Sequence, residues 1–294
     1  MQVISRSARY VGRFTAYVVG STLPAYRLAN GWREKASIVR LALKFVGKRA
    51  VVVLTRLAYN TVLHDDVPVV VRGVTYFVGI DAAEIPVFGE IYHDRDYDRV
   101  PDFMARPGWT VLDVGANAGI FAVQQAYRGA CVYAFEPNPD SFRRLTKTVT
   151  ANRLDDRVTV FNSALGANIG RGALVVPLTG TSNGTVMFGT NPPETGTLTV
   201  PVDTLDHVIS ALQLPCIDLL KVDTEGAELE VLRGAKETQS IVARIVLEHH
   251  SWDKLADARK LLGEYGFSEV LHVDMDTRAG IGILYAQRTP ETKL

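Results

Sequence analysis

Several polar clusters in this 294-residue chain have residue types and spacings suited to chemistry. The first is Asp113-Val-Gly-Ala-Asn-Ala-Gly119, where an acid and a glycine-rich turn follow a short apolar run. Glycines allow close backbone approach, and the helix that follows presents free N–H groups to a ligand. The turn lacks the third glycine of a dinucleotide loop, and Asp113 would repel a pyrophosphate but attract an ammonium group.

A second acid, Glu136, follows the next apolar run about 20 residues after the loop, where an acid accepts hydrogen bonds from ribose hydroxyls. Ser163 lies at the end of the third run, where it could contact the edge of an adenine ring. Together these features favour an adenosyl amino acid as the ligand, and the dinucleotide of a dehydrogenase is the alternative. The predicted cofactor-binding residues are Asp113, Gly115, Ala116, Asn117, Gly119, Glu136, Asn138, Ser163 and Asp223.

The candidate catalytic residues follow two later apolar runs: Asp223 and Glu225 after one, Glu248 and His250 after the other. Residues two apart on a strand share a face, so Glu248 and His250 point the same way. Transfer of a group to a hydroxyl needs alignment of the reactants and removal of the hydroxyl proton. His250 is the natural base, oriented by Glu248 or Asp223. A carboxylate base (Asp223 or Glu225) and pure positioning remain alternatives.

Glu228 stands where an acid favours a helix dipole, so we expect capping there, and the same role is an alternative for Glu225. The catalytic cluster also has donors that a hard divalent cation accepts. Because no dedicated metal motif is present, we predict no metal and keep the cation as the alternative. Tyr92 and Tyr97 are weaker candidates for the substrate mouth, and residues 179–195 for a lid. We assign no acid–base partner to His64, His93, His207 or His272.

Short apolar runs alternating with helix-period segments position these residues and predict βαβ units on a parallel sheet. The predicted strands are 110–114, 131–135, 158–163, 217–222 and 244–248, with helices over 120–127 and 140–151. Strands over 171–177 and 197–202 form a hairpin excursion, and 268–273 pairs antiparallel with 281–286. Before them we expect a hairpin over 67–80 and a helical lead-in over 85–104.

The fold expected is therefore α/β and Rossmann-like: a mostly parallel twisted sheet with an antiparallel C-terminal edge strand and a basic helical N-terminal extension. The expected divisions are residues 1–64, 65–109 and 110–294. Apolar residues make up 47% of the chain and charged residues 22%, which excludes disorder. The two cysteines, Cys131 and Cys216, suit a reducing compartment and exclude a cysteine-built metal site.

The zero net charge is unevenly distributed. Residues 1–64 carry a net +10, histidines aside, and residues 65–294 carry −10. Within residues 1–64, no apolar run is long enough to span a bilayer, and none resembles a secretory signal peptide. Residues 38–57 are typical of a basic amphipathic helix, which either packs on the domain behind it or lies on an anionic membrane surface. An organellar transit peptide is a third interpretation of the first 20 residues.

The motifs resemble the FkbM-type S-adenosylmethionine-dependent methyltransferases. The resemblance rests on residues 113–119, 134–138, 202–206, 217–235 and 246–250, and residues 221–235 are its most specific part. It covers about residues 85–286 and implies a class I methyltransferase fold and O-methylation, often of sugar or other small-molecule hydroxyls. In that family Glu248 and His250 match a Glu-x-His at the same strand end. The resemblance does not include the basic leader.

We therefore expect a cytoplasmic O-methyltransferase acting on a hydroxyl of a sugar, glycolipid or related metabolite, with peripheral membrane attachment as the alternative location. No nucleic acid is expected, because the body is acidic and its aromatics are not interleaved with basic residues as stacking platforms. A nucleic-acid-associated methyltransferase that uses the basic leader, and a degenerate fold that only binds, are the competing functions.

Overall fold

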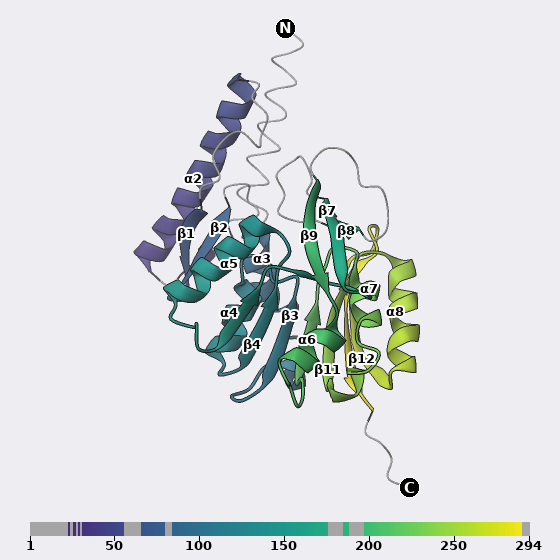
Figure 1. Ribbon diagram of the computed structural model, residues 1–294. Coiled ribbons are helices and arrows are strands. Elements are labelled where there is room, and N and C mark those ends of the chain that lie inside the picture. Colours follow the sequence, from purple (N-terminus) through teal and green to yellow (C-terminus); the bar gives the residue numbers. More distant parts are fainter. Residues whose placement is uncertain are drawn as a thin grey trace. The chain divides into compact units, whose positions relative to one another are not determined.

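Figure 1 shows the computed structural model of the chain, which describes residues 23, 26, 27, 29, 31–55, 66–79, 84–175, 185–187 and 197–289. Contacts divide the chain into two units, residues 1–95 with 178–182 and residues 96–177 with 183–294. The three-part division expected from the sequence stays a prediction. Within the described part of the chain, no helix has the length and apolar character needed to cross a membrane.

The second unit is built on a seven-stranded sheet. Its strand order is β12 (Phe267–Asp276), β13 (Ile281–Arg288), β11 (Arg244–His249), β10 (Leu219–Val222), β3 (Thr110–Val114), β4 (Cys131–Phe135) and β5 (Val158–Phe161). The five strands from β11 to β5 are parallel, and β13 runs antiparallel to both of its neighbours. The expected α/β fold, mostly parallel with an antiparallel C-terminal pair, is confirmed.

Helices join these strands, and their side chains fill the core with those of the sheet. They are α4 (Ile120–Tyr127), α5 (Pro139–Ala151), α6 (Leu205–Ala211), α7 (Glu228–Arg233) and α8 (Trp252–Glu264), with a 3-10 turn, η3 (Pro101–Phe103), before β3 and another, η4 (Gln239–Ile241), before β11. Polar caps fix three helix starts: the side chains of Asn138, Thr204 and Ser251 accept backbone N–H groups of α5, α6 and α8. The central strands are mostly apolar, as parallel strands buried on both faces are, and the buried charged pair of Asp113 in β3 and Lys221 in β10 is an exception.

Two predicted strands differ from the structure at their ends. The strand expected over 158–163 ends at Phe161, because the Asn162 amide turns away to donate to the carbonyl oxygens of Glu136 and Pro137. The strand expected from Ile217 begins at Leu219, and Ile217 makes only an isolated bridge to Val242. The predicted site residues still follow the ends of these strands: Ser163 follows β5, and Asp223 follows β10.

A four-stranded sheet forms the excursion, in the order β6 (Ala164–Leu165), β9 (Thr197–Asp203), β7 (Gly170–Val175), β8 (Thr185–Met187). The two predicted strands of the excursion are confirmed as β7 and β9, paired antiparallel. Strand β8 lies within residues 179–195, where we expected a loop. The remainder of that segment is outside the described residues, and so is the lid expected there.

The first unit contains α2 (Trp32–Thr55), the hairpin of β1 (Asp66–Val71) and β2 (Val74–Gly79), α3 (Glu84–Gly89) and a π-helical turn, η2 (Glu90–Asp94). The predicted hairpin is present and turns at Arg72–Gly73. Both turn residues have positive φ, 52° and 81°, a conformation that two-residue hairpin turns require. Helix α2 packs on β1 through Ile38 and Leu41, which are fully buried.

Candidate active site

The glycine-rich turn between β3 and α4 is the first component of the site. Gly115, Asn117 and Gly119 all have positive φ, at 83°, 50° and 84°. A Cβ on Gly115 would lie 1.7 Å from the backbone carbonyl oxygen of Asp223, so only glycine fits there. The turn therefore lies directly against the end of β10, and the two predicted clusters meet at one edge of the sheet, as ligand sites of open α/β sheets do.

The buried side chain of Lys221 links the end of β3 to the end of β10. Its Nζ lies 3.1 Å from Asp113 Oδ1 and 3.4 Å from Asp223 Oδ2, and it donates to the Gly115 carbonyl at 2.9 Å. Burial would lower the pKa of Lys221, but the charges of Asp113 and Asp223 outweigh burial and raise it, so the ammonium stays charged. The rings of Tyr97 and Phe121 lie over this ammonium, with centroids 5.4 and 5.8 Å away.

Asp113 is completely buried and ion-paired with Lys221. Burial raises the pKa of its carboxyl, and the nearby ammonium opposes that rise. The expected contact of Asp113 with a ligand ammonium stays a prediction. We did not single out Lys221 as a site residue, although one signal was present: a lysine inside an apolar strand is costly to bury without a partner.

Glu136, at the end of β4, also lies beside the glycine turn. Its two carboxylate oxygens accept the backbone N–H groups of Asn117 and Asn138, each at 2.8 Å. Burial raises its pKa to about 7, although those two hydrogen bonds oppose the rise. Ala116 and Asn138 are buried here, and Ser163 is half-buried beyond β5. The predicted cofactor residues thus come from the ends of neighbouring strands β10, β3, β4 and β5.

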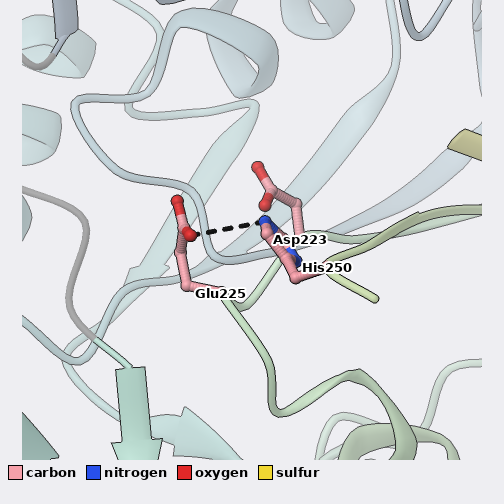
Figure 2. A group of neighbouring side chains, drawn as sticks. All are labelled: Asp223, Glu225 and His250. Carbon is pink, nitrogen blue, oxygen red and sulfur yellow. Dashed lines mark ion pairs between the residues drawn. The ribbon is translucent and has the colours of Figure 1, made fainter. Parts of the chain in front are cut away.

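Figure 2 shows the acidic cluster beyond β10 and β11, where Glu225 and Asp223 surround the His250 ring. His250 Nε2 lies 3.3 Å from Glu225 Oε2 and 3.6 Å from Glu248 Oε1. Glu248 and His250 are on the same side, as predicted, whereas the His249 side chain is fully buried against His272. The structure therefore brings together all four candidate catalytic residues.

Glu228 holds the other nitrogen of His250. Its Oε1 lies 2.8 Å from His250 Nδ1 and accepts the Gly226 N–H at 2.6 Å, so Glu228 both contacts the histidine and caps the turn before α7. Burial would lower the pKa of His250, but the hydrogen bond to Glu228 and the charges of Asp223, Glu228 and Glu225 raise it to about 9. The expectation of capping alone missed this contact with His250.

Tyr97 connects the carboxylates of the two strands. Its hydroxyl donates to Glu248 Oε2 at 2.6 Å and lies 3.2 Å from Asp223 Oδ2. Tyr97 is therefore inside the catalytic cluster. Tyr92 belongs to the other unit, where its hydroxyl hydrogen-bonds that of Tyr76. Its expected place at the substrate mouth stays a prediction.

The sequence alone assigned no acid–base partner to the other four histidines, and the structure places a polar partner beside three of them. His207 Nδ1 lies 2.8 Å from Asp203 Oδ1, because Asp203 ends β9 and His207 lies four residues later, in the first turn of α6. His93 contacts its neighbour Asp94 at 2.7 Å. His272 in β12 and His249 at the end of β11 share a hydrogen bond of 2.9 Å, although β13 lies between these two strands in the sheet. His64 lies outside the described residues.

The residues at this edge fit an adenosyl amino acid. Asn117 Oδ1 and Thr224 Oγ1 are buried polar atoms without a hydrogen-bond partner, and both stand beside the glycine turn. Such atoms are costly unless a ligand satisfies them. One ligand atom from each of Asp223, Glu225 and His250 lies within 4.8 Å of the others, a spacing that a metal ion could bridge. The absence of a metal remains our prediction, argued below.

Comparisons with known proteins fit this geometry. A model of the methyltransferase FkbM domain matches residues 113–269, which include every site residue named above except Tyr92 and Tyr97. The chain belongs to the FkbM methyltransferase family. The family expected from the motifs is confirmed, and this FkbM-family chain is a methyltransferase. The family also supports S-adenosylmethionine as its methyl donor.

Two relatives of this FkbM-family chain are instructive. The hexuronic acid methyltransferase AglP of Haloferax volcanii is 33% identical over 171 residues, covering 58% of this chain and 68% of that protein. The 31-O-demethyl-FK506 methyltransferase FkbM of Streptomyces tacrolimicus is 29% identical over 223 residues, covering 64% and 83%. Among solved structures, magnesium protoporphyrin IX methyltransferase of Synechocystis with bound SAM is similar with a TM-score of 0.46 and 18% identity, covering 72% and 85%.

Proposed function

We propose that this chain transfers a methyl group from S-adenosylmethionine to a hydroxyl of a sugar, glycolipid or related metabolite. The named substrates of the relatives, a hexuronic acid and an O-demethyl compound, support oxygen as the acceptor atom and a small molecule as the acceptor. When bound, S-adenosylmethionine supplies an electrophilic methyl group on a sulfonium. Gly115, Asn117, Glu136 and Asn138 hold it in this proposal, because they line one sheet edge with buried polar atoms.

One observation carries the proposal: a fully buried carboxylate fixes one ring nitrogen of His250, and partly exposed carboxylates face the other. Nδ1 meets the fully buried Glu228, whereas Nε2 faces the partly exposed Glu225 and Glu248. A buried carboxylate that orients a histidine is the usual arrangement of a general base. In the proposal, Nε2 accepts the proton of the acceptor hydroxyl, and Glu228 keeps the ring oriented.

The raised pKa sets a condition on this base. With a pKa of about 9, His250 is mostly protonated at neutral pH, and only the neutral ring accepts a proton. At pH 7 the neutral fraction is about 1% in the absence of ligands. A strong base suits a weakly acidic hydroxyl, so activity should rise with pH until His250 is deprotonated.

The test is a pH–rate profile with labelled methyl donor and a panel of hexuronic-acid and neutral glycans. We expect methyl transfer to at least one glycan, with kcat/KM rising toward pH 9, and a loss of about 100-fold or more in the His250→Gln variant. If His250 serves only as a cation, activity would instead fall above pH 9, and the base would be Asp223 or Glu225. Transfer to none of the oxygen acceptors would overturn the acceptor class.

A further inference from the structure

Helix α2 presents two different faces to its surroundings. One face packs on the hairpin: Ile38 and Leu41 are 2% and 1% exposed, and Ser37 Oγ accepts the Val70 N–H at 3.0 Å. Glu34 secures the same face, because its carboxylate accepts the N–H groups of Arg72 and Gly73 at 3.2 and 2.9 Å. These contacts fix the orientation of α2 on the hairpin. They therefore also determine which side chains of α2 point away from the hairpin.

The outer face carries an apolar stripe, which we call the tryptophan stripe: Trp32, Ala36, Val39 and Leu43. The intervals of four, three and four residues place these side chains in one line along the helix. Trp32 is 76% exposed, Leu43 is 68% exposed and Val39 is 44% exposed. Three such large apolar side chains in one line are unusual on a solvated helix, because single exposed residues are the norm.

Basic residues follow the tryptophan stripe along one side. Arg33, Arg40 and Lys44 are all exposed, and their spacing of seven and four residues places them in a second line beside the first. The Arg33 guanidinium lies 5.5 Å from the centroid of the Trp32 ring. Within residues 31–44, Glu34 is the one acid, and it faces the hairpin. The outer face of α2 is therefore apolar and positively charged.

We infer that the tryptophan stripe and its basic flank dock α2 on an anionic lipid surface. Interfacial helices have this composition: apolar side chains enter the acyl boundary, and Lys and Arg meet the lipid phosphates. Tryptophan is enriched at that depth because its ring is amphipathic. The net charge of +10 on residues 1–64 adds to the electrostatic attraction toward an anionic surface. Nucleic acid is the weaker candidate, because Val39 and Leu43 cannot stack on bases.

This inference does not depend on the proposed reaction, and its test measures binding alone. The full chain is sedimented with phosphatidylcholine vesicles that contain or lack phosphatidylglycerol. We expect retention on the anionic vesicles, weakening with added salt, and little on the neutral ones. Trp32→Ser/Leu43→Ser and Arg33→Glu/Arg40→Glu should each reduce the partition coefficient about tenfold or more.

Matched controls come from the second unit. Ile169→Ser removes an apolar side chain that is 64% exposed, and Lys236→Glu/Lys260→Glu reverses two exposed charges, so neither should change vesicle binding. Far-UV circular dichroism and urea denaturation confirm that each variant is folded. Wild-type failure to bind anionic vesicles overturns the inference, as does unchanged binding by the α2 variants. A shift in RNA retention or in oligomeric state, without a shift in vesicle binding, would assign the face to that partner instead.

Discussion

Glu228 Oε1 and His250 Nδ1 lie 2.8 Å apart, which joins the first turn of α7 to the residue that follows β11. The Glu228 side chain is only 1% exposed. The pair is therefore a unit in which the Glu228 carboxylate orients the His250 ring and raises its pKa.

Replacing Glu228 with Gln tests this unit. The amide oxygen can still accept the Gly226 N–H, but the charge that raises the pKa of His250 is lost. We expect the rising limb of the pH–rate profile to move down by about one pH unit or more, and the plateau rate to fall by about 10- to 100-fold. Glu230→Gln is the control, because Glu230 pairs with Arg233 at the surface. A lower rate with an unmoved pH profile would make Glu228 purely structural.

The stability of the protein should report the His250 pKa directly. His250 titrates at about 9 in the folded protein and at 6.5 in the unfolded chain, so its protonated form stabilises the fold. That contribution is complete below pH 6.5 and is lost as pH rises through 9. Relative to His250→Gln, the wild type should lose about 3 kcal/mol of unfolding free energy between pH 6 and pH 10, measured by urea denaturation. A difference between the two proteins that is independent of pH would contradict the assignment.

Glu136 should make ligand binding depend on pH near neutrality. Because burial raises its pKa to about 7, most of the population is protonated at pH 6 and most is ionised at pH 8. The ionised carboxylate is the better acceptor for ribose hydroxyls, so S-adenosylhomocysteine affinity should rise between those values by up to about tenfold. Calorimetric titration at several pH values measures this change. Glu136→Gln should bind more weakly and without this pH dependence, and a parallel rise in the variant would refute the role.

Lys221 should be necessary for the fold as well as for the site. Lys221→Met leaves the buried Asp113 without its ammonium, and removing one partner of a buried pair costs about 3–5 kcal/mol. The Gly115 carbonyl also loses its donor, so we expect weaker S-adenosylhomocysteine binding. Adding Asp113→Asn should recover part of the lost stability, since the uncompensated charge is then absent. Additive losses in the double variant would show that the two residues do not interact.

Metal removal should leave the activity unchanged. Asp223, Glu225 and His250 have the spacing of a metal group, but the charged Lys221 and the protonated His250 already compensate the carboxylates. Dialysis against EDTA followed by assay without added cations tests this expectation. A loss of activity that Mg²⁺ or Mn²⁺ restores would show that the cluster is a metal site.

The glycine turn, the acids at strand ends and the shared face of Glu248 and His250 were all accessible from the sequence, because strand periodicity and parallel order fix where such residues emerge. Lys221 and Glu228 were not assigned their contacts. The contacts of each residue depend on which elements become neighbours in space. Lys221 needs β3 beside β10, and Glu228 needs α7 beside the end of β11. Local patterns specify strands but not their spatial neighbours, so these long-range pairs needed the structure.

The position of β3 has a consequence for how this protein reaches its native state. β3 pairs on one side with β10, and the Lys221–Gly115 hydrogen bond spans 106 residues of sequence. Closing so long a loop is entropically costly, and topologies rich in such contacts fold slowly. During synthesis the glycine turn emerges from the ribosome long before Lys221 can hold it. The cofactor site is therefore complete only once β10 has paired with β3, and ligand binding can serve as a readout of that pairing.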